Sequence, residues 1–517
     1  MAASMGGHAA RPSMSYCKSC IQRRVILASA ARLPKRLSSS VPQEDFQTKV
    51  SDRTNWHLDT KVESHRHHVG VLQVKPVRLP EPLLTNINAV LQRQTIRNLV
   101  PEATKLSNYL QSRKRPVEEA ELRSAAKFLS EEIGMPDVDA DEVSGQSLSP
   151  DTKKKMQNVM KVLRQRLYRW QAIAYDDIRS LAYMIARMPA NYAALYRVFN
   201  EIRHRDPDFQ PKNILDFGSG VGTAVWAANR VWGEAIREYY LVEVSKSMNQ
   251  LSEMLLRREE GKDELHVPNV YFRYFTPVAL RTRYSVTLSA YSLLELPSLD
   301  DRINTARALW RKTSDYMVLI ESGNYESYLA LMEVRDAILQ EEYGQPEGDL
   351  REEKSTDLQQ PIQDRLIQDE EPVGGHVFAP CPHDMLCPRL QEQRGTPCNF
   401  TQTYHPLPQY VGPRASGLKT ETFCYVVLKK GSRQTDASNW PRVVRPVLKK
   451  SRHVICRLCR PDGSLGEAVI TKSKHSKDLY RCSRYTNWGD MLPVRPGDAS
   501  PGKVSEDGND EEENITQ

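Results

Sequence analysis

The hydrophobic pattern of the chain changes several times, and each change predicts a different kind of element. Apolar residues recur at helical spacing from Leu163 to Met188, and Pro189 should stop or kink that helix. Farther along, short apolar runs alternate with helical patterns at residues 213–217, 239–244, 269–274, 285–290 and 316–321. This alternation predicts a parallel, doubly wound α/β sheet that binds ligands at the carboxyl ends of its strands.

The pattern also divides the chain into regions. Two more strand signals, at residues 399–404 and 423–428, would complete the sheet, and runs at 443–448, 453–458 and 467–471 predict a small β extension. The predicted regions are a helical amino-terminal region (44–210), an α/β domain (211–430) with a solvated acidic insertion (341–371) and a cysteine-rich loop (376–400), a basic β extension (431–500) and an acidic disordered tail (501–517).

The amino end predicts the compartment. Residues 1–43 contain no Asp or Glu, and their Arg and Lys residues are interleaved with Ser, Ala and Leu. This composition is typical of a mitochondrial transit peptide, so we expect import into the matrix. No stretch approaches the ~20 apolar residues that span a bilayer, so no membrane partner is expected. With nine cysteines in 517 residues, the chain is also unlike a disulfide-stapled secreted scaffold.

The first predicted strand of the sheet runs into a glycine-rich turn. Gly218, Gly220 and Gly222 follow Asp216, and a helical pattern begins directly after them. Such glycines let a ligand approach the backbone. Their spacing is Gly-x-Gly-x-Gly, which differs from the Gly-x-Gly-x-x-Gly spacing of folds that bind dinucleotides such as NAD. Asp216 suits a cationic amino-acid group, while Glu243, at the end of the next strand, suits the two hydroxyls of a ribose. The pattern favours S-adenosylmethionine over NAD; the alternative is a turn that only packs strand against helix.

Cysteines form a second group of candidate ligands. Three thiols lie in a Pro-rich stretch, and two more follow in a strand-like run: Cys381, Cys387, Cys398, Cys456 and Cys459. Four thiolates can close a tetrahedral zinc site or hold an iron–sulfur cluster, and the wide, irregular spacing favours the cluster. A zinc site and ordinary buried thiols remain the alternatives. For Cys424, inside a strand-like run, we expect an ordinary buried thiol.

Positive charge is concentrated in two places. The whole chain has a net charge of +7, but residues 401–500 hold 18 Lys or Arg against 7 Asp or Glu, with Tyr480, Tyr485 and Trp488 interleaved. A second basic run extends from Lys153 to Arg169 on a predicted helix. Basic residues position a phosphate backbone, and exposed aromatics can stack unpaired bases. The two faces favour RNA as the partner, with no DNA expected, over the alternative of plain solvated surfaces.

Five motifs, in order over residues 180–493, carry a family resemblance. They are residues 187–193, 215–223, 380–388, 398–400 and 458–463. Together they resemble the methyltransferase-like family of mitochondrial small-ribosomal-subunit assembly factors, which has bacterial relatives. Two features depart from the family pattern: a long spacer of ten residues between Cys387 and Cys398, and Ser322-Gly323-Asn324 where bacterial relatives tend to have Pro-Gly-Thr.

The resemblance implies a Rossmann-like class I methyltransferase fold, a 4Fe-4S cluster, association with small-subunit ribosomal RNA and a requirement for mitochondrial translation. It also implies that Cys459, and not Cys456, is the fourth cluster ligand. The candidate residues are then Asp216, Gly218, Gly220, Gly222 and Glu243 for S-adenosylmethionine, and Cys381, Cys387, Cys398 and Cys459 for the cluster.

The sequence identifies no catalytic residue. Residues 289–296, after the fourth strand, lack the Asn/Asp-Pro-Pro-aromatic run with which base-modifying methyltransferases hold an exocyclic amine. Glu295 is a candidate acid near the pocket, and its alternative is a solvated carboxylate at a helix start. We therefore expect an RNA-binding assembly factor built on a methyltransferase fold, with an active S-adenosylmethionine-dependent ribosomal RNA methyltransferase as the alternative.

Overall fold

The computed structural model describes residues 48–50, 58, 64–93, 98–116, 118, 170–258, 264–277, 282–343, 374–392, 395–411, 417–433 and 439–496. They belong to two compact units: the first lies within residues 74–379 and 389–433, and the second within 41–73, 380–388 and 434–517. The predicted transit peptide (1–43), the basic run 153–169 and the acidic tail (501–517) lie outside the described residues.

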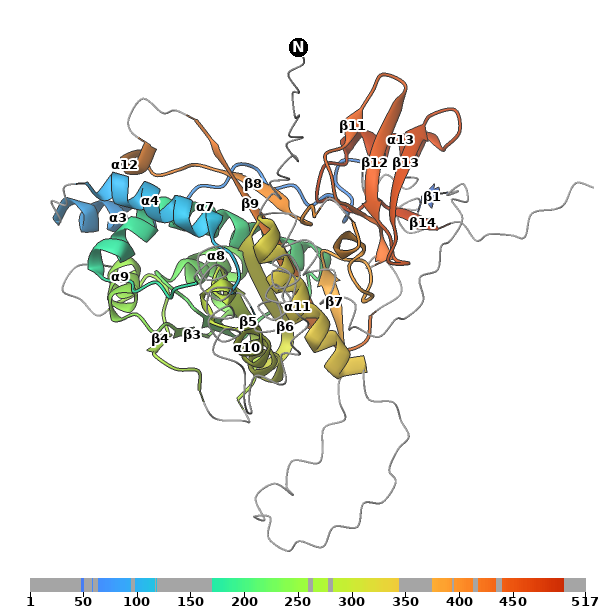
Figure 1. Cartoon of the computed structure of the whole chain (residues 1–517). Coiled ribbons are helices and arrows are strands. Elements are labelled where there is room, and N and C mark those ends of the chain that lie inside the picture. The colour runs from blue at the N-terminus through green and yellow to red at the C-terminus, as the bar shows by residue number, and fades with distance from the viewer. Residues whose placement is uncertain are drawn as a thin grey trace, which may run out of the picture. The chain divides into compact units, whose positions relative to one another are not determined.

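The first unit is built on one sheet, to which eight strands of the described chain contribute (Figure 1). The order is β4-β3-β2-β5-β6-β9-β7, and β8 pairs with the same edge of β9 as β7 does. Only β9 runs against the other strands. This mostly parallel sheet confirms the predicted α/β fold class. The strands are β2 Asn213–Phe217, β3 Glu238–Val242, β4 Val270–Arg273, β5 Tyr284–Ala290, β6 Thr313–Ser322, β7 Gly375–Ala379, β8 Phe400–Tyr404 and β9 Lys419–Lys430.

Helices cover both faces of this sheet. The chain moves from β2 to β3 and β4 in one direction and from β5 to β6 in the other, so right-handed crossovers place α8 and α9 on one face and α10 on the other. Helix α7 packs on α4, α8 and α9, while α11 packs on α10. The direction reverses between β2 and β5, and ligands bind at such a switch point. The helices of this unit are α3 Glu81–Arg93, α4 Leu99–Ser112, α7 Asp177–Arg205, α8 Thr223–Trp232, α9 Lys246–Leu256, α10 Leu299–Arg311, α11 Tyr325–Tyr343 and α12 Pro408–Val411, with 3-10 turns at Gly233–Ala235, Leu293–Glu295 and Pro388–Leu390.

Helix α7 differs from the prediction at both ends. Residues 170–176 are not helical, the helix begins after the capping side chain of Asp176, and it continues through Pro189 to Arg205. The predicted stop at Pro189 is therefore wrong. An interior proline costs a helix roughly 3 kcal/mol, but most side chains of α7 from Ser180 to Ile202 are buried. Packing on this scale outweighs the local penalty.

The cysteine-rich loop is an insertion within one edge of the sheet. Strand β7, which the sequence analysis assigned in part to the loop 376–400, ends at Ala379 opposite Val427 of β9. Strand β8 then begins at Phe400 opposite Phe423, farther along the same edge. The chain thus leaves the sheet at the end of β7 and returns at the start of β8, on the same edge of β9. The predicted acidic insertion also needs correction at its start, because α11 extends to Tyr343.

The second unit contains the predicted β extension. Strand β12 pairs with β10 and β11 on one side and with β13 on the other, and α13 packs on β12 and β13. The predicted strand 443–448 is two short pieces, β10 and β11. Val454, Cys456 and Leu458 of β12 point into a core that includes Ile470, Leu479 and Leu492. The elements are β1 Thr48–Val50, β10 Arg442–Val443, β11 Leu448–Lys449, β12 His453–Cys459, β13 Leu465–Thr471, α13 Lys477–Tyr485 and β14 Val494–Pro496, the last paired with β1.

A buried polar network joins α7 to β9 in the first unit. Arg187 Nη2 and Nη1 donate to Glu421 Oε1 and Oε2 at 2.6 and 3.2 Å. Arg187 Nη2 also donates to Asn191 Oδ1 at 3.0 Å, and Asn191 Nδ2 donates to the Tyr183 hydroxyl at 2.9 Å. The Tyr291 hydroxyl donates to Glu421 Oε1 at 3.3 Å. Arg187 and Glu421 are both buried, so each neutralises a charge that water cannot reach.

We predict that Glu421→Gln destabilises the first unit by about 3–5 kcal/mol, because it leaves the Arg187 guanidinium charged and unpaired in the interior. Glu253→Gln, at the half-exposed Arg257–Glu253 pair at the carboxyl end of α9, is the matched control and should cost less than about 1 kcal/mol. Urea denaturation of the whole chain measures both. The double variant Arg187→Met/Glu421→Leu should recover part of the loss; equal effects of Glu421→Gln and the control would contradict the assignment.

Candidate functional site

The glycine turn lies between β2 and α8, at the switch point of the sheet. Gly218, Gly220 and Gly222 all have positive φ, at 71, 53 and 73°. A Cβ on Gly218 would lie 2.5 Å from Ser292 Cβ, and one on Gly222 would lie 2.2 Å from Ser252 Oγ. Gly220 differs, because the nearest atom to its added Cβ is Tyr183 Cε1 at 4.0 Å. The outer two glycines therefore permit close packing, and the middle one leaves open space beside the backbone.

Glu243 holds this turn in place. It follows the last residue of β3, and its Oε2 accepts from the Gly220 N–H at 3.0 Å while its Oε1 accepts from the Ser245 N–H at 2.8 Å. Burial raises the pKa of Glu243, and the two backbone hydrogen bonds oppose that rise. The structure thus brings Glu243 and the turn together as predicted, and shows that the carboxylate also binds the backbone of the turn.

Asp216 is the second acid beside the turn. Its side chain is 3% exposed, and no hydrogen bond or ion pair joins it to another described residue. Burial, followed by the nearby charge of Glu243, raises the pKa of Asp216 to about 8. A buried carboxyl of this kind stays largely protonated at neutral pH, and a cation bound beside it would favour the ionised form.

Two exposed apolar side chains stand at the same edge of the sheet. Val242 of β3 is paired with Arg273 of β4, and two residues beyond this pair Val244 and Phe275 are 79% and 81% exposed. Each lies two residues beyond the end of its strand, and Val244 is the neighbour of Glu243 in the chain. The sequence pattern singled out neither of them.

A segment that we call the strap, residues 113–116, 118 and 170–176, crosses this edge. Trp170 Nε1 donates to the Leu294 carbonyl at 2.9 Å, beyond β5, and Ser245 Oγ donates to the Tyr175 carbonyl at 2.8 Å, beyond β3. Since β2 lies between β3 and β5, residues 170–175 pass over the end of β2 that carries the glycine turn. Arg113 pairs with Glu295, so the candidate acid Glu295 is held in an ion pair rather than solvated.

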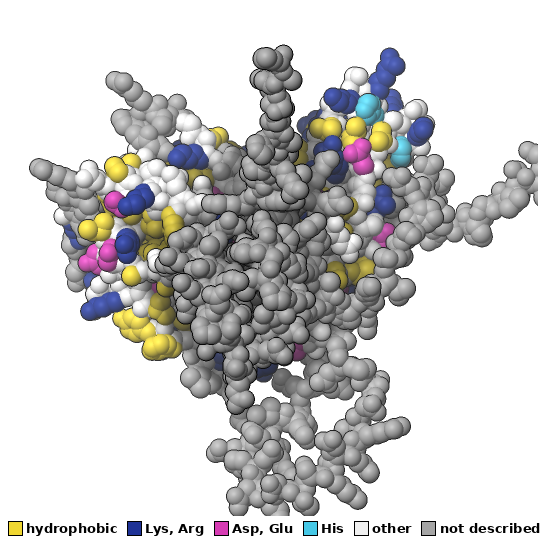
Figure 2. All heavy atoms as spheres, viewed as in Figure 1, with side chains coloured by type: hydrophobic (Ala, Val, Ile, Leu, Met, Phe, Trp, Pro, Cys, Tyr) yellow, Lys and Arg dark blue, Asp and Glu magenta, His cyan; other side chains and the backbone are white. Residues whose placement is uncertain are grey.

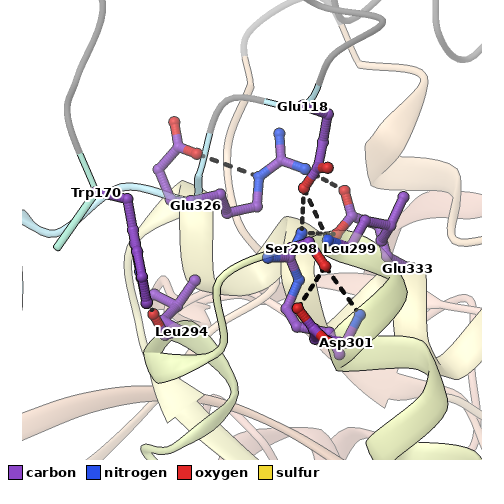
Figure 3. Close-up of polar contacts among 10 residues, drawn as sticks. Glu118, Trp170, Leu294, Ser298, Leu299, Asp301, Glu326 and Glu333 are labelled. Carbon is purple, nitrogen blue, oxygen red and sulfur yellow. Dashed lines mark hydrogen bonds and ion pairs between the residues drawn. The ribbon is translucent and has the colours of Figure 1, made fainter. Parts of the chain in front are cut away.

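The other half of the strap is anchored on α10 and α11 (Figure 3). Arg115 pairs with Glu326 and Glu333 of α11. Glu118 Oε1 accepts from the Leu299 N–H at 2.8 Å, at the amino end of α10, where the helix dipole favours a carboxylate. It also pairs with the fully buried Arg302 at 3.3 Å. These pairs join residues nearly two hundred positions apart, so no local pattern in the sequence predicts them.

Because the pKa of Asp216 is higher in the folded chain than its ordinary value of 3.8, its contribution to stability is complete below pH ~4 and is lost as the pH rises towards 8. We predict that Asp216→Asn removes this pH dependence. Relative to the native chain, the variant's free energy of unfolding should rise by up to several kcal/mol between pH 5 and 8, since a shift of one pKa unit corresponds to about 1.4 kcal/mol. Above pH 9 this difference should increase no further. Denaturant midpoints at pH 5, 6, 7, 8 and 9 measure the difference; a constant difference would show that Asp216 is already ionised at pH 5.

Three of the four predicted cluster ligands belong to the second unit and are buried: Cys381, Cys387 and Cys459. His383 Nε2 lies 3.3 Å from Cys459 Sγ. Cys398 is half-buried and belongs to the first unit. In the part of the chain that the structure describes, no three or more His, Cys, Asp or Glu side chains gather where they would hold a metal ion. The structure thus gives no support to the predicted 4Fe-4S site.

The side-chain directions on β12 distinguish two neighbouring thiols. Cys456 points into the hydrophobic core of the second unit, and burial raises its pKa to about 12. Cys459, three residues on, lies beside His383 instead. Thiolates are the metal-binding form of cysteine, so the core position of Cys456 disfavours it as a ligand. Cys424 is buried within β9, as expected of an ordinary core thiol.

The strand order and the glycine turn define the class of this protein: a Rossmann-like fold of the methyltransferase type, with its candidate cofactor site at the switch point. Comparison with known proteins identifies its family. A sequence profile described as mitochondrial small ribosomal subunit Rsm22 matches residues 177–345 and 359–493, more than half of the chain. The chain belongs to the Rsm22 family.

Two relatives and one solved structure illustrate the likeness. The mitochondrial ribosome assembly protein METTL17 of Homo sapiens is 39% identical over 443 residues, 86% of this chain and 89% of the human protein. An Rsm22-cox11 tandem protein of Schizosaccharomyces pombe is 26% identical over 62% of this chain and 43% of its own length. The magnesium protoporphyrin IX methyltransferase of Synechocystis aligns with a TM-score of 0.25 and 11% identity over 54% of this chain and 98% of its own.

The family and these relatives carry mitochondrial names, which confirms the predicted mitochondrial location. Among the described residues, no helix has the length and apolar character needed to cross a bilayer.

Proposed function

We propose that this chain is an assembly factor of the mitochondrial small ribosomal subunit, that it binds the ribosomal RNA of that subunit, and that mitochondrial translation requires it. The observation that carries the proposal is the 39% identity, over 86% of the chain, to a human protein named as a mitochondrial ribosome assembly protein. The family profile extends through the second unit to residue 493 and so includes its basic sheet. Such a basic surface suits a phosphate backbone.

The first unit, in this proposal, binds S-adenosylmethionine. The buried Asp216 carboxyl suits the cationic amino-acid end, and the open space beside Gly220 admits a ligand next to the backbone. Glu243 keeps lone pairs for ribose hydroxyls, and Val244 and Phe275 suit the two sides of an adenine ring. When bound, the cofactor supplies an activated methyl group; the residues named here bind and orient it.

The position that an acceptor base would use is filled by the chain itself. Tyr291 follows β5 directly, has a φ of 59°, and is half-buried, with its hydroxyl donating to Glu421. Base-modifying methyltransferases use the residues after this strand to hold the acceptor amine. A tyrosine held inward by a buried ion pair offers no such contact, which favours an assembly factor over an enzyme. The alternative, an active ribosomal RNA methyltransferase, is favoured by the intact glycine turn and Asp216.

One experiment tests the proposal and separates it from this alternative. We predict that the full chain binds immature small-subunit particles and transfers no labelled methyl group to their RNA, and that Asp216→Asn binds the particles equally well. Sedimentation with purified particles and scintillation counting of the extracted RNA measure the two properties. Failure to bind particles would contradict the proposal, whereas label that appears with the native chain and not with Asp216→Asn would establish the methyltransferase.

We also propose that Cys381, Cys387, Cys398 and Cys459 hold a 4Fe-4S cluster, as the family resemblance implies. The burial of three of these thiols in one unit supports it, and so does the position of Cys456 in the core. A four-iron cluster takes each thiolate on a separate iron, so its ligands need not converge on one point as they do around zinc.

We predict that Cys459→Ala loses iron, while Cys456→Ala, the matched control three residues away on the same strand, keeps it. Anaerobic purification followed by absorption spectroscopy and by iron, sulfide and zinc analysis measures the outcome. A loss of iron in the control as well would point to general unfolding, which the denaturation midpoint of each variant reports. One zinc and no iron in the native chain would overturn the cluster and leave a zinc site.

A further inference from the structure

The sheet of the second unit has one face packed on its core and one face turned away from it. Val454, Cys456 and Leu458 of β12 point into the core with Ala468 and Ile470 of β13. Because side chains alternate along a strand, the residues between them point outward. In the middle of the three strands the outward residues are Leu448, Ile455, Arg457, Glu467 and Val469, whereas the outward Cys459 at the end of β12 is buried.

Three of the outward residues form a continuous apolar row. Ile455 of β12 is paired with Leu448 of β11 on one side and with Val469 of β13 on the other. Directly paired residues of antiparallel strands place their side chains together on one face. Leu448 is 37% exposed and Val469 is 49% exposed, and Ile455 between them is half-buried. We call these three residues the apolar row; a contiguous apolar patch with a polar rim is a feature of interaction sites.

A group of cations stands at one end of this row. His453 at the start of β12 is paired with Thr471 at the end of β13, so the β11–β12 turn and the residues after β13 come together. The exposed residues there are Lys450, Arg452, Lys472, Lys474 and Lys477, which we call the basic tip. No Asp or Glu occurs in residues 448–461 or 468–477. Figure 2 shows hydrophobic side chains over β11 to β13 with Lys and Arg side chains around them.

At the other end of the row, Arg457 forms an exposed ion pair with Glu467 at 3.1 Å. Its planar guanidinium can stack on a base as an aromatic ring does. The surface therefore offers phosphate-binding cations at one end, apolar side chains in the middle and a guanidinium plane at the other end. A polyanion with accessible base faces matches all three, and a duplex hides those faces.

We propose that the apolar row and the basic tip form a platform for single-stranded RNA, in which the tip binds phosphates and the row carries unpaired bases. The proposal deepens the RNA-binding role proposed above and depends on it. The platform selects unpaired segments of ribosomal RNA, because duplex RNA can reach the basic tip with its phosphates but cannot place bases on the row.

The test compares two variants of the full chain with a single-stranded RNA oligonucleotide and with an RNA hairpin stem of the same length. Leu448→Thr/Val469→Thr removes apolar contact and keeps β-forming residues. Lys472→Glu/Lys474→Glu/Lys477→Glu reverses charge at the tip. Lys105→Glu is the charge control, because Lys105 is exposed on α4 of the first unit and so does not belong to the sheet that carries the row and the tip. Fluorescence anisotropy at several salt concentrations gives affinities and salt slopes, and denaturation midpoints report folding.

We predict that the row variant binds the single strand about three- to tenfold more weakly, by the loss of buried apolar surface, with an unchanged salt slope and unchanged binding to the hairpin. The tip variant should weaken binding to both RNAs and flatten the salt slope by roughly two units, at about 0.7–0.9 per lost phosphate contact. Lys105→Glu should change neither affinity by more than about twofold.

The outcomes separate this platform from the RNA-binding role itself. Native binding of the single strand by a folded row variant overturns the platform, and the RNA-binding role stands if the tip variant is still impaired. If RNA binding does not depend on salt and neither variant changes it, both the platform and the RNA-binding role are overturned. A row variant that keeps its RNA affinity and loses association with small-subunit particles would assign the apolar row to a protein partner, and so would also overturn the platform.

Discussion

The buried pair of Arg187 and Glu421 is the contact on which the geometry of the first unit depends. It ties the longest described helix to the one strand that runs against the rest of the sheet. Neither charge can be left alone in the interior, so the helix has one rotation and one height relative to β9. That setting places Tyr183 beside Gly220 and holds the hydroxyl of Tyr291. A single ion pair thus positions both Tyr183, beside the glycine turn, and Tyr291, directly after β5.

How much of this structure the sequence predicts depends on the range of the interactions involved. The parallel strands and the glycine turn were predicted correctly, since alternating hydrophobicity and glycines between a strand and a helix are local signals. Strand β7 was missed because its five residues adjoin the cysteine-rich stretch and were read with it. Pro189 was expected to stop or kink its helix, and it does not stop it, because packing on α4, α8 and α9 retains the helix. The strap depends on ion pairs such as that of Glu118 with Arg302, and no pattern in the sequence around either residue predicts them.

In the candidate site, too, the sequence shows the local features and the structure adds those that depend on contacts between distant residues. The sequence located Asp216 and Glu243 from their positions at strand ends, and the structure adds what only three dimensions supply: the protonated state of one and the backbone contacts of the other. For the thiols, spacing alone left Cys456 and Cys459 equivalent. Their opposite directions on β12 separate them, and the same alternation gives the outward Ile455 its place between Leu448 and Val469. One strand therefore packs into the core with one set of side chains and carries a different set on its other face.

The position of the cysteine-rich loop between β7 and β8 has a consequence for how the chain tolerates change. Both ends of the loop are paired with β9, at Val427 and at Phe423, so the sheet sets their separation whatever lies between them. Closing a longer loop between fixed ends costs little, about 0.6 kcal/mol for each doubling of its length. Residues can thus be gained or lost between Cys387 and Cys398 without disturbing a strand. The ten residues between Cys387 and Cys398 thus form a spacer whose length the sheet tolerates at little cost.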